Sequence, residues 1–194
     1  MSEEPQRTDT NGLALIEANV WRRLFDHRTV YLRGPIMEQV ADTLCAQLMA
    51  LDAESDRDVT LFINSPGGEM TGMFAVYDVV QLMRSQVHTV CVGMAASAGS
   101  FLLATGTGVR SATPNSRIMI HQPHGGVQGT AADVEIQARQ HLWMRERMSS
   151  IYAERTGRSL EEITRDTDRD RWCSAGEAVD YGLVDRVQIG SLPG

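Results

Sequence analysis

The stretch VCVGMAASAGSFLLATG, residues 90–106, is almost wholly apolar and small, and it carries a serine, Ser97, near its middle. A membrane-spanning helix needs about 20 predominantly apolar residues, whereas this run is shorter and is interrupted by glycine, serine and threonine. A buried strand at 89–93 and a buried helix at 100–106, which ends at a glycine, fit the pattern better. The stretch therefore predicts a strand, a tight turn at Ser97 and a helix.

The alternation of strand and helix continues on both sides of this stretch. Strands are predicted at 28–32, 58–64, 116–121 and 183–187, and helices at 35–54, at 72–85 and from the cap Thr130 to about Arg155. Ser159 with Glu162 and Ser174 with Glu177 have the spacing of capping boxes, which predicts two shorter helices. This order is typical of an α/β fold with largely parallel strands.

The composition limits the classes of partner and mechanism that this protein can have. The 194 residues suit one domain with a sizeable core. The net charge is −7 and no basic run occurs, which argues against a nucleic-acid partner. All 18 basic residues are arginine, so mechanisms that need a lysine amine, such as a Ser–Lys dyad or a Schiff base, are excluded.

The cysteines and the N-terminus indicate the compartment. Cys45, Cys91 and Cys173 are far apart and odd in number, so we expect small core hydrophobes rather than disulfides or a zinc site. The first residues, MSEEPQRTDTNG, lack the order of a signal peptide. We therefore expect a cytoplasmic protein with a flexible N-terminal arm at 1–19 and a single domain at 20–190.

Reactive side chains follow the ends of three predicted strands. Gly67-Gly68 follows 58–64, Ser97 follows 89–93, and His121 closes 116–121. Because the carboxyl ends of parallel strands meet at one edge of a sheet, these groups can converge. A serine nucleophile needs a base and oxyanion donors, and histidine is the available base. His121 is favoured over His124, which lies on the following loop. The alternatives are a buried hydroxyl, a core histidine and a simple glycine turn.

The acid that would orient the histidine is not decided by the residues alone. Asp166, Asp168 and Asp170 lie within RDTDRDRW, and such acidic clusters are commonly solvated helix ends. All three aspartates stay open at this point.

Four blocks in order resemble the proteolytic subunit of the caseinolytic (Clp) protease. They are FINSPGGEMTGMFAVYD (62–78), GMAASAGSFLLATG (93–106), PNSRIMIHQPHGG (114–126) and RDTDRDRWCSAGEAVDYGLVD (165–185). The resemblance covers roughly residues 20–187. It implies a crotonase-like fold of repeated ββα units, with a protruding handle made of the segment around 124–130 and the long helix. It also implies two stacked heptameric rings and an AAA+ ATPase that feeds in unfolded proteins, with no cofactor bound by this chain and ATP used by the partner.

The resemblance also implies roles for individual residues. Ser97 falls on the nucleophile, His121 on the base and Asp170 on the orienting acid, and the backbone N–H groups of Gly68 and Ala98 fall on the oxyanion hole. A substrate groove would be bordered by four further residues, Glu69, Met70, His124 and Gly125.

The sequence departs from the family pattern at several of these places. Glu69 stands where a small or apolar residue is usual, and His124 stands where leucine is common. Thr60 and Phe62 occupy positions where aromatic residues often line the ATPase-docking pocket. These departures make a weakly active or non-catalytic paralogous subunit of a hetero-oligomeric ring one alternative. The other alternative is an acyl-CoA enzyme of the same crotonase-like fold, in which the paired glycines would hold a thioester oxyanion.

Overall fold

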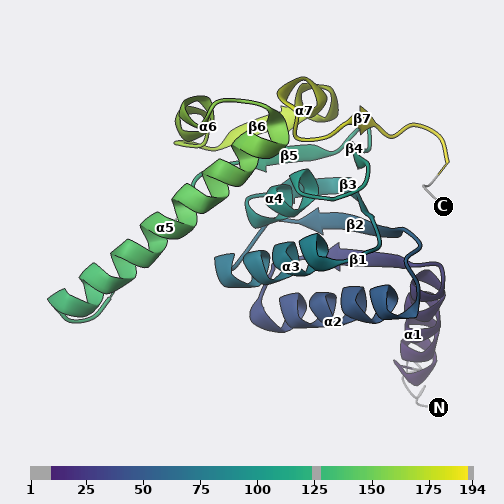
Figure 1. Ribbon diagram of the computed structural model, residues 1–194. Helices are drawn as coiled ribbons and strands as arrows, with labels where there is room; N and C mark the ends of the chain where they lie inside the picture. Colours follow the sequence, from purple (N-terminus) through teal and green to yellow (C-terminus); the bar gives the residue numbers. More distant parts are fainter. Residues whose placement is uncertain (1–9, 124–127, 192–194) are drawn as a thin grey trace, which may run out of the picture.

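A mixed sheet of seven strands organises the computed structural model, which describes residues 10–123 and 128–191 (Figure 1). The strands are β1 (Thr29–Arg33), β2 (Val59–Ser65), β3 (Val87–Ala96), β4 (Arg110–Ala112), β5 (Arg117–Ile120), β6 (Arg171–Ser174) and β7 (Arg186–Val187). Their order is β1-β2-β3-β4-β7, and β5 pairs with the second half of β3 and with β6. All pairs are parallel except β5 with β6.

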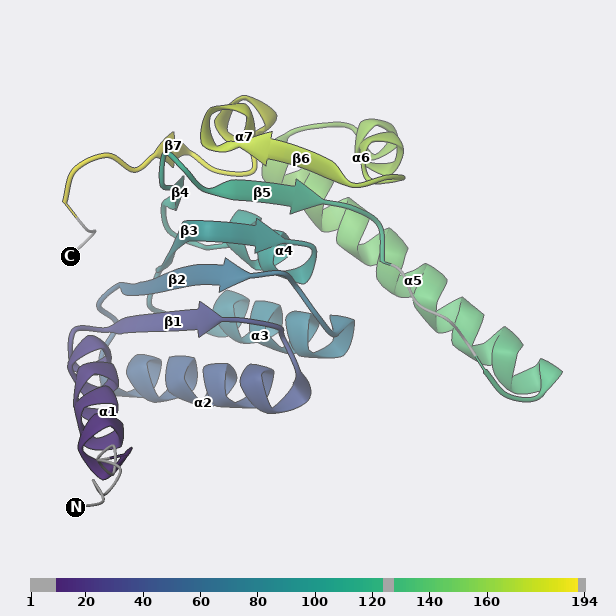
Figure 2. The same cartoon turned by 180° about the vertical axis from the view of Figure 1, so that it is seen from behind.

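The helices alternate with these strands along much of the chain. They are α1 (Thr10–Asp26), α2 (Glu38–Glu54), α3 (Met70–Leu82), α4 (Ala98–Ala104), α5 (Ala131–Thr156), α6 (Leu160–Asp166) and α7 (Ala175–Tyr181). Helices α2, α3 and α4 lie on one face of the sheet, and the view from behind in Figure 2 shows the strands in front of them. The predicted α/β class with largely parallel strands is confirmed.

The core forms where α2 and α3 meet the sheet. Leu44, Leu48 and Leu51 of α2 follow one helical face and are buried, and Leu61 and Ile63 of β2 are buried with them in the same core cluster. Each such side chain contributes about 1.5–3 kcal/mol when it leaves water. The apolar spacing that predicted this helix is therefore the face that holds it against the sheet.

Three elements differ from the predictions. The short strand β4 and the antiparallel strand β6 were not predicted, because three or four residues with mostly polar or exposed side chains give no measurable alternation. Helix α1 begins at Thr10, so residues 10–19 of the predicted arm are helical. The domain boundaries at 19 and 190 stay predictions, since residues 1–9 lie outside the described part of the chain.

Helix α5 is anchored at its C-terminal end only. Met148, Ile151 and Tyr152 are buried, whereas the N-terminal half runs out beyond the sheet (Figures 1 and 2). It begins at the predicted cap Thr130, whose side chain accepts the Asp133 N–H, and ends at the left-handed Gly157. The predicted handle is not confirmed, because residues 124–127 of its other part lie outside the described residues.

The cysteines are free, as expected. Cys91 and Cys173 are buried, and Cys45 is half-buried. Burial raises the pKa of the Cys91 thiol to about 11 and also raises the pKa of Cys173. These thiols therefore stay protonated and inert at neutral pH. Within the described ranges, no helix is long and apolar enough to cross a bilayer.

Candidate active site

Ser97 occupies a sharp turn between β3 and α4. Its φ of 54° and ψ of −123° lie in a region that residues with a side chain rarely adopt. The Ser97 N–H donates to the Met119 carbonyl at 2.9 Å, which ties the turn to β5. Such a conformation costs roughly 1–3 kcal/mol and is found mainly at functional sites. The turn places the serine hydroxyl beyond the end of the strand.

The sheet register brings Ser97 and His121 together. Beyond Gly93, whose φ is 78°, β3 pairs with β5 so that Ala96 lies opposite Met119. Ser97 and His121 each follow their strand within two residues of this pair. His121 Nε2 lies 2.8 Å from Ser97 Oγ, which is within the hydrogen-bonding range expected of a nucleophile and its base.

Asp170 completes the hydrogen-bonded chain from the other side of His121. The antiparallel register of β5 and β6 sets Ile120 opposite Arg171, so Asp170 stands next to His121. Its Oδ1 lies 3.0 Å from His121 Nδ1. An ionised carboxylate only accepts, so Nδ1 carries the imidazole proton and Nε2 is left to accept the serine proton. The His121 side chain is 16% exposed and the Asp170 side chain 57%.

The other two aspartates have different partners. Asp168 accepts from Gln122 Nε2 at 3.1 Å, and Asp166 accepts from the Tyr181 hydroxyl at 3.1 Å. The backbone adds to this connection, because the Gln122 N–H donates to the Thr167 carbonyl at 2.6 Å. The tertiary structure therefore separates three acids that the sequence left equivalent: one touches the imidazole, and two hold the surrounding loop.

Gly68 and Ala98, whose backbone N–H groups are the predicted oxyanion donors, line the same pocket as Ser97. Ile36 and Gly68 form an isolated parallel β-bridge. The Ile36 N–H donates to the Gly67 carbonyl, and the Ile36 carbonyl accepts from the Glu69 N–H. In such a bridge the N–H of the middle residue points to the opposite side. Ala98 is the first residue of α4, so its N–H has no acceptor within the helix. Among the described residues, neither N–H donates to a protein acceptor outside the helices and strands.

The glycines of this segment are required by space. A Cβ on Gly68 would lie 2.2 Å from the Ile36 carbonyl oxygen, and a Cβ on Gly67 would lie 2.6 Å from Ser97 Cβ. Gly67 also has a φ of 97°. No larger residue fits at either position without displacing the backbone beside Ser97. The Gly67-Gly68 pair is therefore more than a turn after a proline.

A pocket of about 150 Å³ opens beside the serine. It is lined by Gly68, Met70, Met73, Ser97, Ala98, His121, Pro123 and Met148. Of the four predicted groove residues, Met70 lines this pocket, whereas the exposed Glu69 precedes α3 and does not line it. His124 and Gly125, the other two predicted groove residues, lie outside the described part of the chain.

Behind the turn lies a buried pair of hydroxyls that the sequence did not predict. Ser100 Oγ donates to the Ser97 carbonyl at 2.7 Å and lies 2.9 Å from the Tyr152 hydroxyl. Burial raises the pKa of Tyr152, so this hydroxyl stays protonated and can donate to Ser100. Ser100 lies one helical turn after Ser97, but nothing in the sequence predicted that Tyr152, on a distant helix, would reach it.

The arrangement places a general base beside a hydroxyl, which is the geometry that assisted nucleophilic attack requires. Within residues 10–123 and 128–191, no group of three histidine, cysteine or carboxylate side chains is placed to hold a metal ion. In a comparison with known protein families, the family model for Clp protease matches residues 14–190. The matched segment includes every residue of the hydrogen-bonded chain described above.

Proposed function

The chain belongs to the Clp protease family, and from this premise we propose that it is a serine endopeptidase whose nucleophile is Ser97. Membership of the family implies a proteolytic subunit. The observation that supports the proposal at the level of residues is the pair of contacts at His121, 2.8 Å to Ser97 Oγ and 3.0 Å to Asp170 Oδ1. A serine, a histidine and an aspartate in this relation form a triad, whatever their order in the chain.

In the proposed acylation step, Ser97 Oγ attacks the carbonyl carbon of the scissile peptide. His121 Nε2 takes the hydroxyl proton as the new C–O bond forms, and it then gives that proton to the leaving amine as the C–N bond breaks. Asp170 stabilises the imidazolium in between. Water, activated by the same nitrogen, hydrolyses the ester and restores the serine. General base catalysis of this kind contributes about 10²–10⁴-fold.

The Gly68 and Ala98 N–H groups are proposed to hold the oxyanion of the tetrahedral intermediate. Their position at a glycine bridge and at the start of α4 keeps them oriented before the substrate arrives, so no reorganisation is needed in the transition state. Loss of one such donor costs about 2.7–4 kcal/mol of transition-state stabilisation.

The pocket of three methionines is proposed to take the substrate side chain before the scissile bond. Met70, Met73 and Met148 supply an apolar and adaptable lining, and about 150 Å³ suits a side chain of medium size. Substrates with an apolar residue at that position should therefore be cut in preference to those with a charged one.

Assembly and energy supply are proposed from the family alone. Two stacked heptameric rings would enclose the active sites, and an AAA+ ATPase would unfold and deliver the substrate proteins, using ATP that this chain does not bind. A paralogous proteolytic subunit could share the ring. Glu69, beside the proposed oxyanion donor, differs from the small or apolar residue that is usual in the family. For this reason a weakly active or non-catalytic subunit is the second candidate.

A fluorophosphonate probe with a fluorescent tag distinguishes the two candidates. An active triad predicts covalent labelling at Ser97 that is lost in Ser97→Ala and His121→Ala, together with hydrolysis of a fluorogenic peptide. The control is His27→Ala, since His27 is exposed and precedes β1; this variant should be labelled like the wild type. Absence of labelling in a folded, assembled wild-type protein would leave the non-catalytic subunit as the better description.

A further inference from the structure

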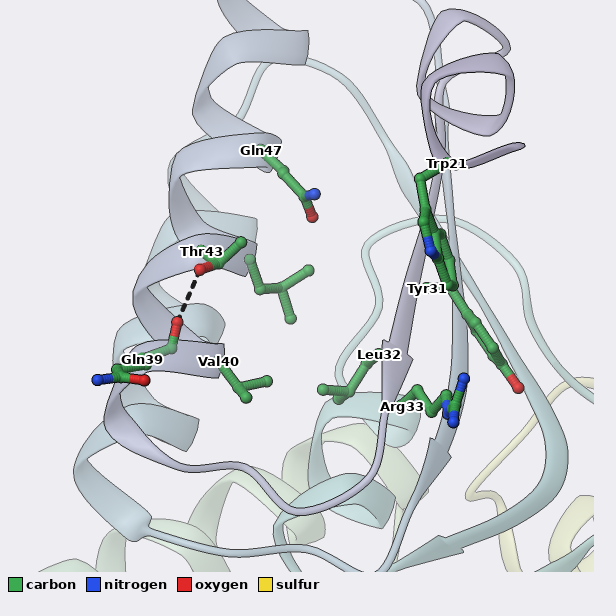
Figure 3. Close-up of a pocket in the computed structure, with 9 residues that line it drawn as sticks. Trp21, Tyr31, Leu32, Arg33, Gln39, Val40, Thr43 and Gln47 are labelled. Carbon is green, nitrogen blue, oxygen red and sulfur yellow. Dashed lines mark hydrogen bonds between the residues drawn. The ribbon is translucent and has the colours of Figure 1, made fainter. Parts of the chain in front are cut away.

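A second cavity, of about 380 Å³, lies between α2 and the outer edge of β1 (Figure 3). We call it the β1 edge groove. Its lining residues are Trp21 of α1, Tyr31, Leu32 and Arg33 of β1, and Gln39, Val40, Thr43, Leu44 and Gln47 of α2. It shares no lining residue with the pocket beside Ser97. The proposed proteolytic mechanism makes no use of it.

The lining shows that the groove follows the edge of the strand. Successive side chains of a strand point to opposite faces, yet three consecutive residues of β1, Tyr31 to Arg33, border the same cavity. A cavity on one face of the sheet would contact alternate residues only. Figure 3 shows β1 and α2 facing each other across the space.

Within the described part of the chain, the backbone of β1 is unpaired on this side. The Gly34 N–H donates to Asn64 O, and the Arg28 carbonyl accepts from Thr60 N. Since alternate residues of a strand direct their N–H and C=O groups to opposite edges, the even-numbered residues of β1 face β2. Tyr31 and Arg33 therefore direct their backbone groups outward, and β1 has no second neighbour in the described sheet.

The side chains around the groove form an apolar part and a polar part. Leu32, Val40 and Leu44 form an apolar part. Gln39, Thr43 and Gln47 form a polar row along α2, in which the Thr43 hydroxyl donates to the Gln39 backbone carbonyl. Within the described residues, the side-chain amides of Gln39 and Gln47 make no hydrogen bond.

Arg33 adds a positive charge at the end of the strand. Its side chain is exposed, and among residues 10–123 and 128–191 its guanidinium makes no ion pair or hydrogen bond. Trp21 stacks on Tyr31 with ring centroids 6.0 Å apart. The groove thus combines an open backbone edge, an apolar side, and carboxamides and a cation that have no partner among the described residues, in a protein of net charge −7.

We propose that the β1 edge groove binds an extended segment of a partner protein, which adds to the sheet as a strand beside β1. Backbone hydrogen bonds to Tyr31 and Arg33 would give affinity, as in other cases of strand addition. Alternate side chains of the segment would enter the apolar side at Leu32, Val40 and Leu44. The intervening side chains would lie on the face of Tyr31 and Arg33, where acidic residues complement the guanidinium.

The proposal is tested with fluorescein-labelled heptapeptides and the full chain. The peptide Glu-Val-Glu-Val-Glu-Val-Glu should bind, as measured by fluorescence anisotropy, and its fully N-methylated form should not, because it cannot donate backbone hydrogen bonds. Arg33→Glu should weaken binding by about tenfold or more, the effect of losing a charge-assisted contact. The lysine counterpart, Lys-Val-Lys-Val-Lys-Val-Lys, should show the reverse preference for this variant.

Arg147→Glu on α5 is the matched control, because Arg147 is exposed and lies on an element that does not line the groove; it should bind the acidic peptide like the wild type. Peptidase activity of Arg33→Glu should be unchanged, which verifies its fold. The proposal is overturned if no peptide binds, or if Arg33→Glu and N-methylation leave binding unaltered. It is also overturned if Arg33→Glu changes only the sedimentation of the protein, since the groove would then be a contact between copies of this chain.

Discussion

Ser97 can adopt its turn only because no side chain occupies Gly67. We predict that Gly67→Ala abolishes peptidase activity and destabilises the fold, because the added Cβ would lie 2.6 Å from Ser97 Cβ at a φ of 97°. The control is Gly34→Ala, where φ is 80° and nothing lies within 4 Å of the added Cβ. That variant should lose only about 1–2 kcal/mol, the cost of a left-handed residue with a side chain.

Thermal unfolding and hydrolysis of a fluorogenic peptide measure both effects. If the two glycine variants lose stability and peptidase activity to the same extent, the backbone conformation alone, and not contact with the serine, causes these losses.

Asp170 is predicted to act through the tautomer of His121. Asp170→Asn replaces the acceptor at Nδ1 by an amide that can also donate, so Nε2 is no longer held ready to accept the serine proton. We expect kcat to fall by about 10²–10⁴-fold with little change in KM. Asp168→Asn is the control, since Asp168 contacts Gln122 rather than the imidazole. A larger fall in the Asp168 variant would contradict the assignment of Asp170.

At the scale of elements, α4 is held against α5 directly behind Ser97. Ser100 donates to the Ser97 carbonyl, and the Tyr152 hydroxyl donates to Ser100. Tyr152→Phe should cost about 1 kcal/mol of stability and lower kcat, because it loosens the start of α4. Tyr181→Phe also removes a hydroxyl contact, to Asp166, and should leave kcat unchanged. Equal kcat values in the two variants would show that the α4–α5 contact does not position the serine.

Two short helices are stabilised by ionised carboxylates at their starts. The Ser159 N–H lowers the pKa of Glu162, and the Ser174 N–H lowers the pKa of Glu177. A pKa lowered on folding stabilises the protein above the ordinary value of 4.5, and that stability is lost as the pH falls through the lower folded value.

The free energy of unfolding, measured with denaturant from pH 7 to pH 3, should therefore start to decline near the ordinary carboxyl pKa. The decline should be shallower in the double variant Glu162→Gln, Glu177→Gln. Glu161→Gln is the control, because Glu161 is exposed and closes no capping box. An unchanged slope in the double variant would contradict the contribution of the two boxes.

At the scale of the whole molecule, the exposed part of α5 carries apolar side chains that a monomer would leave in water. Ile136, Leu142 and Trp143 are 60%, 46% and 59% exposed. If this helix joins two rings, Ile136→Asp should convert the double ring into single rings in analytical ultracentrifugation, since a buried charge without a partner is strongly unfavourable. Val109→Asp, at an exposed loop position, should leave the double ring intact. An intact double ring in the Ile136 variant would exclude this helix from the contact.

Local sequence patterns were sufficient for much of the fold. The helix from Thr130 to Gly157, both capping boxes and the main parallel strands are confirmed, because capping residues and apolar periodicity act over a few neighbours in the chain. The strands β4 and β6 were missed, because their pairing depends on distant partners rather than on their own composition.

By itself the sequence determined the strand–turn–helix at Ser97, the glycine pair and a histidine at a strand end. The residue pattern left three aspartates open and the family resemblance pointed to Asp170. The tertiary structure supplies the contact between Asp170 and that histidine, because the contact depends on the antiparallel register between β5 and β6. The tertiary structure alone also brought the Tyr152 hydroxyl within hydrogen-bonding distance of Ser100 and left the outer edge of β1 accessible beside α2. Such contacts unite residues far apart in the chain, and their geometry is set by the packing of whole elements rather than by any local preference.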